Sequence, residues 1–246
     1  IEHLEKTGAA NGTITKHLSG IRAAITRAVE LAWIPEDPMK GVKTSGRGKA
    51  AVKTQNWNIA DFNRLFAQDI KQQELMLFQL LSATGFRLEE GAAIDWANIK
   101  VSDEGVNYFD LHALNKILKT ENAMRNVPIH RQLMQFLNAY GEAGGRDGRL
   151  FNYSKDKDGK CVKGATKALD PYLKVARYEN GIKVKHLKTH GLRGTFTSAC
   201  YKVGMPDSMR RFIGGWKQRG EDQAYLEPDL DKENEMLQKI DFAHIG

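Results

Sequence analysis

The stretch QELMLFQLLSATG, residues 73–85, is apolar on nearly every face when it is drawn as a helix. A helix with one apolar stripe can lie on a surface, whereas a helix that is apolar all round must be covered on most sides. The preceding IADFNRLFAQDI, residues 59–70, has helical period, and Asn58 is a suitable N-cap. A core therefore begins near residue 58, and a chain of 246 residues is long enough to complete it.

Short strands and further helices follow this core segment. Alternating and β-branched residues at 106–111 and 126–129 predict a small antiparallel sheet. The polar, glycine-bearing residues 152–165 predict an exposed loop. Helical patterns occur at 131–145, 192–203, 207–213 and 222–239. The predicted fold class is mainly α with one small antiparallel β-sheet (α+β).

The first part of the chain has a different character. Residues 13–34 have the apolar period of an amphipathic helix, with Thr13 as the expected N-cap, and Pro35 and Pro38 end it. The following MKGVKTSGRGKAAVKT is glycine-bearing and basic with no acid, which indicates a flexible linker that either contacts phosphate or is a solvated loop between domains. The cations of this linker are Lys40, Lys43, Arg47, Lys49 and Lys53.

The charge of the chain is unevenly distributed. Lys and Arg exceed Asp and Glu by seven, and the pI is about 9.3. From Glu221 onward, eight acids stand against two lysines, a net charge of −6 that leaves +13 on the residues before it. Such a surplus attracts a polyanion, so nucleic acid is the leading class of partner.

Nothing in the sequence indicates a membrane or an oxidising compartment. There is no run of 18 apolar residues, and the starting IEHLEKTG lacks the features of a signal peptide. The two cysteines, Cys161 and Cys200, fit no zinc or redox spacing. We expect a cytoplasmic protein with free thiols, associated with the nucleoid.

The basic stretch KHLKTHGLRGTF, residues 185–196, contains the first candidate site. His190 and Arg193 lie three residues apart at the start of a predicted helix, so they share a face. An arginine fork matches two phosphate oxygens and a histidine can move a proton, although a solvated helix start would look the same. His186 and His190, four residues apart, are the only candidate pair of metal ligands. Because the flanking lysines would repel a cation, we expect no metal site.

Three other stretches accompany this pair. ATGFRLEEGAAIDW contains Arg87 and, three residues later, Glu90. KTENAMRNVPIH places Lys119 ahead of a predicted strand, and RRFIGGWKQRGEDQAYLEP places Trp216 nine residues before Tyr225. In this order, the four boxes TGxRxxE, KT with RxVP, HxLR and GW with a later tyrosine resemble the tyrosine recombinase, or phage integrase, family. The resemblance runs from about Asn58 to the C-terminus and extends weakly over residues 13–42.

The resemblance implies a division of the chain into domains. Residues 1–45 would be part of a larger helical, SAM-like core-binding domain, and residues 46–56 the basic linker. Residues 57–246 would be the catalytic integrase domain with its acidic C-terminal tail. The chain would then be a fragment of a longer recombinase.

The resemblance also implies an activity. The protein would be a site-specific DNA recombinase that cuts and rejoins strands through a 3′-phosphotyrosine intermediate, for integration or excision of a phage or mobile element, without a metal or cofactor. The expected catalytic residues are Arg87, Lys119, His190, Arg193, Trp216 and Tyr225.

Each of these residues has an expected role. Tyr225 attacks the phosphodiester, and two arginines clamp its oxygens. Lys119 protonates the leaving 5′ oxygen, with Lys116 as the alternative, and His190 accepts or donates a proton. Trp216, where most members have histidine, hydrogen-bonds the phosphate. Glu90 is expected to orient Arg87 or His190, although a surface carboxylate remains the alternative.

The expected partners follow from the same resemblance. The protein would bind double-stranded DNA at specific recombination sites, with His186 and Lys188 near the backbone beside the linker cations, and would assemble as a dimer or tetramer on DNA. Its C-terminal segment, with an apolar stripe from Leu230 to Ile240, would dock on a neighbouring protomer or cap its own core. The alternative functions are a DNA-binding regulator or directionality protein without catalysis, a type IB topoisomerase and a metal-dependent nuclease.

Overall fold

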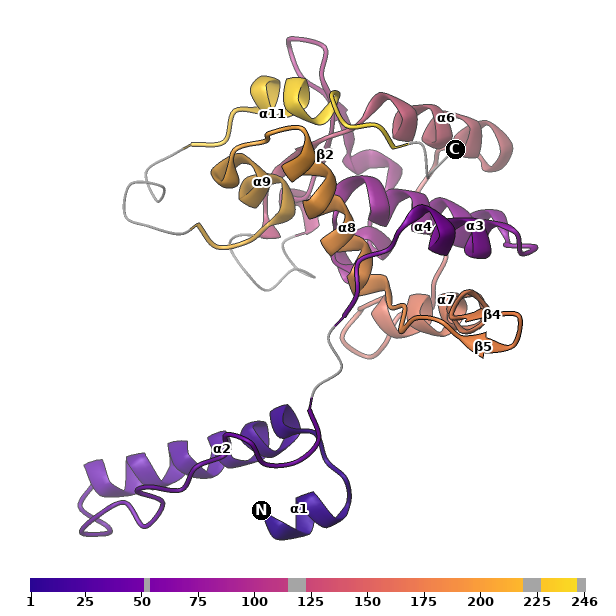
Figure 1. Cartoon of the computed structure of the whole chain (residues 1–246). Helices are drawn as coiled ribbons and strands as arrows, with labels where there is room; N and C mark the ends of the chain where they lie inside the picture. Colours follow the sequence, from indigo (N-terminus) through magenta and orange to yellow (C-terminus); the bar gives the residue numbers. More distant parts are fainter. Residues whose placement is uncertain (51–53, 115–122, 219–226, 243–246) are drawn as a thin grey trace. The chain divides into compact units, whose positions relative to one another are not determined.

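The computed structural model describes residues 1–50, 54–114, 123–218 and 227–242 of the chain. It divides into two compact units, Ile1–Lys53 and Thr54–Gly246 (Figure 1). Among the described residues, no helix combines the length and the apolar character that a membrane span requires.

The first unit consists of α1 (Glu2–Lys6), α2 (Asn11–Glu30) and the basic stretch that follows them. The expectation of Thr13 as N-cap is wrong, because α2 begins at Asn11 after Ala10. The Asn11 side chain donates to the carbonyl of Arg47 (2.9 Å), and the Asn11 backbone N–H donates to Lys49 (2.9 Å). Because the backbone carbonyls of Arg47 and Lys49 accept from Asn11, this part of the basic stretch lies against the start of α2.

The second unit is built around a buried helix, α4 (Gln72–Thr84), as its apolar sequence predicts. Helices α8 (Thr189–Lys202) and α6 (Arg131–Gly144) pack against it, and α3 (Ile59–Phe66) packs against α7 (Val162–Ala176) (Figure 1). These helices supply most of the core, in the mainly α architecture that the sequence predicts.

Helix α3 begins where the sequence predicts. The Asn58 side chain accepts from the backbone N–H of Asp61 (2.9 Å), and the Asp61 carboxylate accepts from the backbone N–H of Asn58 (2.8 Å). This capping box fixes the entry of the chain into the core, where Trp57 packs against Phe62.

A three-stranded antiparallel sheet has the order β1-β2-β3, from β1 (Ile99–Val101), β2 (Asn107–Asp110) and β3 (Asn126–Pro128). Phe109 lies opposite Val127 in the register, and both are buried. The two later strands of this sheet were predicted from the sequence, whereas β1 was not.

Two elements near the middle of the chain were not predicted. Helix α7 begins at Val162, so the expected loop over residues 152–165 is wrong at its end. After α7, β4 (Tyr178–Glu179) and β5 (Ile182–Lys183) form a hairpin whose turn residues Asn180 and Gly181 both have positive φ. Such a turn favours asparagine followed by glycine.

The remaining elements are short. They are α5 (Leu88–Ala92), the 3₁₀ helices η1 (Trp96–Asn98) and η2 (His112–Leu114), α9 (Asp207–Gly214) and α11 (Leu230–Leu237). Of the helix predicted over residues 222–239, the described part begins at Leu230. Helix α11 packs on β3 of its own chain, and Leu237, Ile240 and Phe242 are buried in the core.

Candidate functional site

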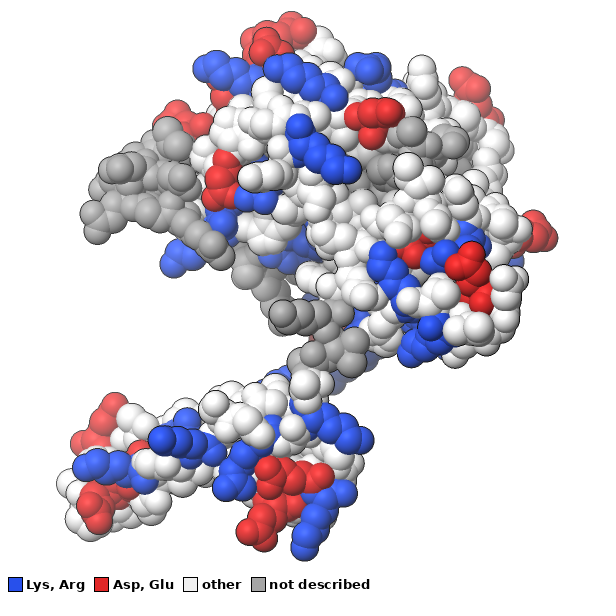
Figure 2. Space-filling view, in the orientation of Figure 1, with Lys and Arg blue, Asp and Glu red and all other residues white. Residues whose placement is uncertain are grey.

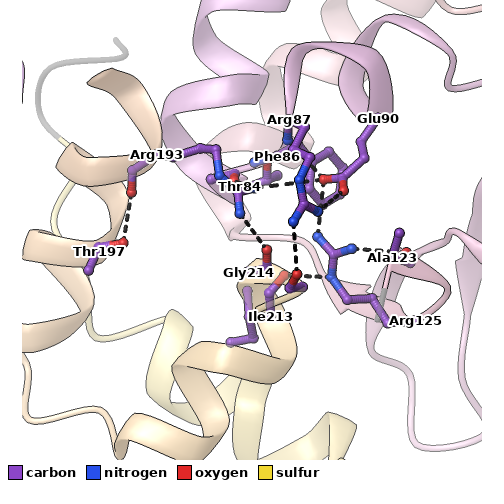
Figure 3. A network of polar contacts seen from close by, with 12 residues as sticks. Thr84, Phe86, Arg87, Glu90, Ala123, Arg125, Arg193, Thr197, Ile213 and Gly214 are labelled. Atoms are coloured by element: carbon purple, nitrogen blue, oxygen red, sulfur yellow. Dashed lines mark hydrogen bonds and ion pairs between the residues drawn. The ribbon is translucent and has the colours of Figure 1, made fainter. Parts of the chain in front are cut away.

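Polar groups from four separate segments meet inside the second unit (Figure 3). Arg87 is the N-cap of α5 and Glu90 lies within that helix. Arg125 immediately precedes β3, Arg193 lies on α8, and the end of α9 contributes backbone carbonyls. The cluster thus joins residues that lie up to 128 positions apart in the chain.

The spacing of the TGxRxxE box has a local structural reason. Gly85 ends α4 with φ +64°, and a Cβ at this position would lie 2.5 Å from Phe196 Cδ1, so only glycine fits. Arg87 is the N-cap residue of α5. The Glu90 carboxylate accepts hydrogen bonds from the backbone N–H of Arg87 (2.8 Å) and from Arg87 Nη1 (2.6 Å). Glu90 is 1% exposed, whereas the Arg87 side chain is 44% exposed. Glu90 is therefore a buried support for Arg87, not a surface carboxylate.

Arg193 is buried behind this turn. Its guanidinium donates to the carbonyls of Gly85 and Gly214, the latter at 2.9 Å, and its Nη1 lies 3.8 Å from Glu90 Oε2. The guanidinium carbon lies 4.5 Å from the centre of the Trp216 ring, a cation–π contact. Burial lowers the pKa of Arg193 to about 10, so the side chain remains a cation at neutral pH.

A third arginine, Arg125, completes the cluster. The sequence matched it only as part of the RxVP box and predicted no role for it. Its Nη2 donates to Glu90 Oε2 (3.3 Å), its Nε to the carbonyl of Ile213 (2.8 Å) and its Nη1 to the carbonyl of Ala123 (2.9 Å). Nothing in the spacing of the boxes could have shown that this side chain turns toward Glu90.

The three arginines share the C-terminal end of α9. Three consecutive carbonyls there each accept from a different guanidinium: Ile213 from Arg125, Gly214 from Arg193 and Gly215 from Arg87 (Figure 3). The last carbonyls of a helix have no partner within it and carry partial negative charge. The end of α9 thus fixes the three cations relative to one another.

The cluster carries more positive than negative charge. Burial would raise the pKa of Glu90, but Arg125 and the hydrogen bonds from Arg87 hold it below its usual value. One ionised carboxylate therefore lies among three guanidinium groups, which leaves an excess of two positive charges. With Arg87 open to solvent, this arrangement suits an oxyanion such as a phosphate group.

His190 and Trp216 lie at the edge of this cluster. His190 is exposed on the first turn of α8; partial desolvation, then Arg193 and Arg87, lower its pKa, so its imidazole is neutral at pH 7. The Trp216 ring lies directly over Gly214, where an added Cβ would come within 1.7 Å of it. The glycine before the GW pair is thus required for the position of the indole.

Two expected catalytic residues are outside the described part of the chain. Lys119, with its alternative Lys116, falls in residues 115–122, and Tyr225 falls in residues 219–226. Their roles therefore remain predictions. Ala123, the first described residue after the lysine segment, is held by Arg125 in the cluster.

The expected DNA contacts are spread over both units. The Lys188 carbonyl accepts from Trp57 Nε1 (3.1 Å), the His186 backbone N–H donates to Gln55 Oε1 (3.3 Å), and Lys53 is outside the described residues. Of the linker cations, Arg47 pairs with Glu5 (3.3 Å). On the face in view in Figure 2, Lys and Arg are interspersed with Asp and Glu, so that face is not a single basic patch.

No group of three or more His, Cys, Asp or Glu side chains within the described ranges could hold a metal ion.

Comparisons with known proteins agree with the fold. The phage integrase family model matches residues 57–231, and no curated protein matches the chain. The similar solved structures include a Tn1549 transposon integrase in complex with circular intermediate DNA, with 14% identity and a TM-score of 0.64 over 90% of this chain and 80% of that one. A lambda integrase dimer bound to a core site has 13% identity and a TM-score of 0.57 over 90% of this chain and 71% of that one. The integrase from mycobacterium phage Brujita has 13% identity and a TM-score of 0.56 over 91% of this chain and 70% of that one.

Proposed function

The chain belongs to the phage integrase family of tyrosine recombinases, and on this premise we propose that it cuts and rejoins DNA at specific sites through a 3′-phosphotyrosine intermediate. One observation carries the proposal: Arg87 and Arg193, the two residues expected to clamp a phosphate, are held together by Glu90 and the end of α9. The reaction would serve the integration or excision of a phage or mobile element, and the protein would be cytoplasmic and associated with the nucleoid.

The arginine cluster would stabilise the charge that develops on the phosphate. A phosphodiester carries one negative charge, and attack by an oxygen nucleophile creates a five-coordinate transition state with more charge on the non-bridging oxygens. Fixed cations that are already in place stabilise this charge without reorganising. The exposed Arg87 would contact the oxygens directly, with the buried Arg193 behind it.

The remaining steps move protons and exchange one bond. The Tyr225 oxygen forms a bond to phosphorus as the bond to the 5′ oxygen breaks, and Lys119 gives that leaving oxygen its proton. His190, neutral at pH 7, would accept the tyrosine proton, and the Trp216 N–H would donate to the phosphate. Attack by a 5′ hydroxyl from another strand reverses these steps and joins the DNA, so no metal or nucleotide cofactor is needed.

Double-stranded DNA and further copies of the chain are the proposed partners. The similar Tn1549 structure is named as a complex with circular intermediate DNA, and the lambda structure as a dimer bound to a core site. We propose that this chain also assembles on DNA as a dimer or tetramer, with His186, Lys188 and the linker cations Lys40, Lys43, Arg47, Lys49 and Lys53 near the backbone. Docking of the apolar stripe from Leu230 to Ile240 on a neighbour would first require Leu237 and Ile240 to leave their own core.

Covalent trapping tests the proposal. A pool of random-sequence duplexes, each with one nick, would be incubated with the protein, and adducts would be isolated on a denaturing gel and sequenced. We expect adducts from the wild type and from the control Tyr201→Phe, whose tyrosine is 78% exposed on α8, with or without EDTA. We expect none from Tyr225→Phe.

Four results would contradict the proposal. Adducts from Tyr225→Phe would exclude this tyrosine as the nucleophile, and cleavage that EDTA abolishes would favour a metal-dependent nuclease. If the wild type bound DNA without forming an adduct, the protein would be a regulator without catalysis. A wild type that only relaxed supercoiled DNA, without joining two duplexes, would be a type IB topoisomerase.

A further inference from the structure

Arg125 differs from the other two arginines of the cluster in how its donors are used. Its Nε, Nη1 and Nη2 each donate to a protein acceptor, and the residue is only 7% exposed. Its guanidinium also lies over the Phe86 ring, 5.5 Å from the centre. Because each of its three nitrogens already donates to the protein and its surface is covered, Arg125 is not available to hold a phosphate.

The acceptors of Arg125 belong to the supports of the phosphate arginines. Glu90 Oε2, which accepts from Arg125, also accepts from the backbone N–H of Arg87. The Ile213 carbonyl immediately precedes the Gly214 and Gly215 carbonyls, which hold Arg193 and Arg87. Phe86, beneath the guanidinium, is the residue before Arg87. Arg125 therefore contacts Glu90, which also holds Arg87, and the same helix end whose carbonyls accept from Arg193 and Arg87.

Charge gives Arg125 a second effect on the same site. A carboxylate that is as deeply buried as Glu90 needs cations and hydrogen bonds to remain ionised. Without Arg125, the excess charge of the cluster falls from two to one. The site would then attract a phosphate less, and the transition state, which carries more negative charge, would lose more stabilisation than the singly charged ground state.

We propose that Arg125 is a positioning residue for DNA cleavage: it fixes Glu90 and the end of α9, and so holds Arg87 and Arg193 where they meet the charge of the scissile phosphate. This inference rests on the proposed recombinase function. Arg125 itself touches neither the DNA nor the reacting atoms.

The test compares two substrates that differ only in the charge of the scissile phosphate. One is the duplex recovered by covalent trapping, and the other carries a methylphosphonate at the cleaved linkage, which lacks the negative charge. Single-turnover adduct formation would be measured for the wild type, Arg125→Met and Arg125→Lys. The control is Arg64→Met: Arg64 also pairs with a buried carboxylate, Asp61, and donates to a carbonyl, Ala176 (3.1 Å), but lies outside the cluster.

We expect Arg125→Met to slow cleavage of the phosphodiester by roughly 100-fold. On the methylphosphonate the same variant should come within about 3-fold of the wild type, because both the ground state and the transition state then carry one negative charge fewer to be stabilised. Arg125→Lys, which keeps the charge but cannot reach three acceptors, should lose about 10-fold on the phosphodiester. Arg64→Met should change both substrates by the same small factor.

Several outcomes would overturn the inference. Arg125→Met could cleave the phosphodiester at the wild-type rate, or it could be equally slow on both substrates, as a general loss of packing would make it. If Arg125→Met does not fold, as judged by circular dichroism, Arg125→Lys carries the same comparison. A wild type without any adduct would refute the recombinase function and this inference together, whereas an active wild type with an equally active Arg125→Met would refute the inference alone.

Discussion

The two halves of the arginine cluster differ in their access to solvent. The buried floor consists of Glu90, Arg125 and Arg193, which are 1%, 7% and 4% exposed. The more accessible rim consists of the exposed Arg87 and His190 and the half-buried Trp216. The floor is held by many partners, and the rim rests on the floor through Glu90, Gly214 and Gly215. From this difference we infer that the floor sets the geometry and charge of the site, while in the proposed reaction the rim would contact the phosphate and move protons.

The largest effect is expected from the centre of the floor. Arg193→Met removes a cation from behind the phosphate and leaves the carbonyls of Gly85 and Gly214 without their donor. We expect adduct formation to slow by roughly 1,000-fold in single-turnover assays. The control is Lys202→Met at the exposed end of the same helix. A loss of less than 10-fold would show that the floor does not stabilise the transition state.

Glu90→Gln tests whether the floor depends on charge or only on shape. The glutamine can still accept from the Arg87 backbone but leaves three cations that repel one another. The positive excess rises, but because the arginines lose the carboxylate that positions them, we expect a loss of roughly 100-fold in rate and about 3 kcal/mol in the free energy of unfolding.

The stability difference should depend on pH. The pKa of folded Glu90 lies below its ordinary 4.5, so the stabilisation is present above pH 4.5 and is lost as pH falls through the folded-state pKa. Urea unfolding of both proteins across this range measures it. A difference that does not shrink in acid would contradict a charged Glu90.

His190→Asn tests the rim. Neutral His190 should accept a proton during cleavage, so protonation of His190 in acid should abolish activity. Because the pKa of His190 is lowered from its ordinary 6.5, this loss should occur below pH 6.5. We expect the variant to be roughly 30-fold slower at neutral pH and to lack this acid limb. The matched control His186→Asn should keep the limb. An unchanged pH profile for His190→Asn would move the proton transfer to another residue.

Trp216→Phe should have the smallest effect. The substitution removes the N–H but keeps a ring over Gly214 and Arg193, so we expect a loss of about 5-fold. Trp216→Ala, which also uncovers the Arg193 guanidinium, should lose more. If both variants were equally slow, the hydrogen bond and not the ring would be the contribution of this side chain to the rim.

The sequence singled out all three residues of the rim and two of the floor, Glu90 and Arg193, but it predicted no role for Arg125. The resemblance to the four boxes identified these residues because each lies close in the chain to the other residues of its box, which is local information. The buried α4 was predicted for a similar reason, since its apolar residues on every side are visible within thirteen positions. The position of Arg125 depends on Glu90 and Ile213, which lie 35 and 88 residues away. A pattern of neighbouring residues cannot predict contacts between residues so far apart in the chain.

Helix α7 shows how a local signal can mislead. Gly164 and Pro171 lie inside the helix, and both residue types disfavour helix interiors. Gly164 is there because an added Cβ would come within 2.7 Å of Ser154, so the glycine serves the contact with the preceding loop. The buried Ala165, Leu169 and Leu173, at steps of four, were the signal that would have found this helix.

The most direct measurement is the identity of the residue that becomes joined to DNA. The adduct recovered from the duplex pool would be digested with nuclease and trypsin, and the peptides would be sequenced by mass spectrometry. The account predicts a nucleotide attached through its 3′ phosphate to Tyr225 in the peptide GEDQAYLEPDLDK, residues 220–232. A nucleotide on any other residue, or a 5′-phosphate linkage, would contradict it.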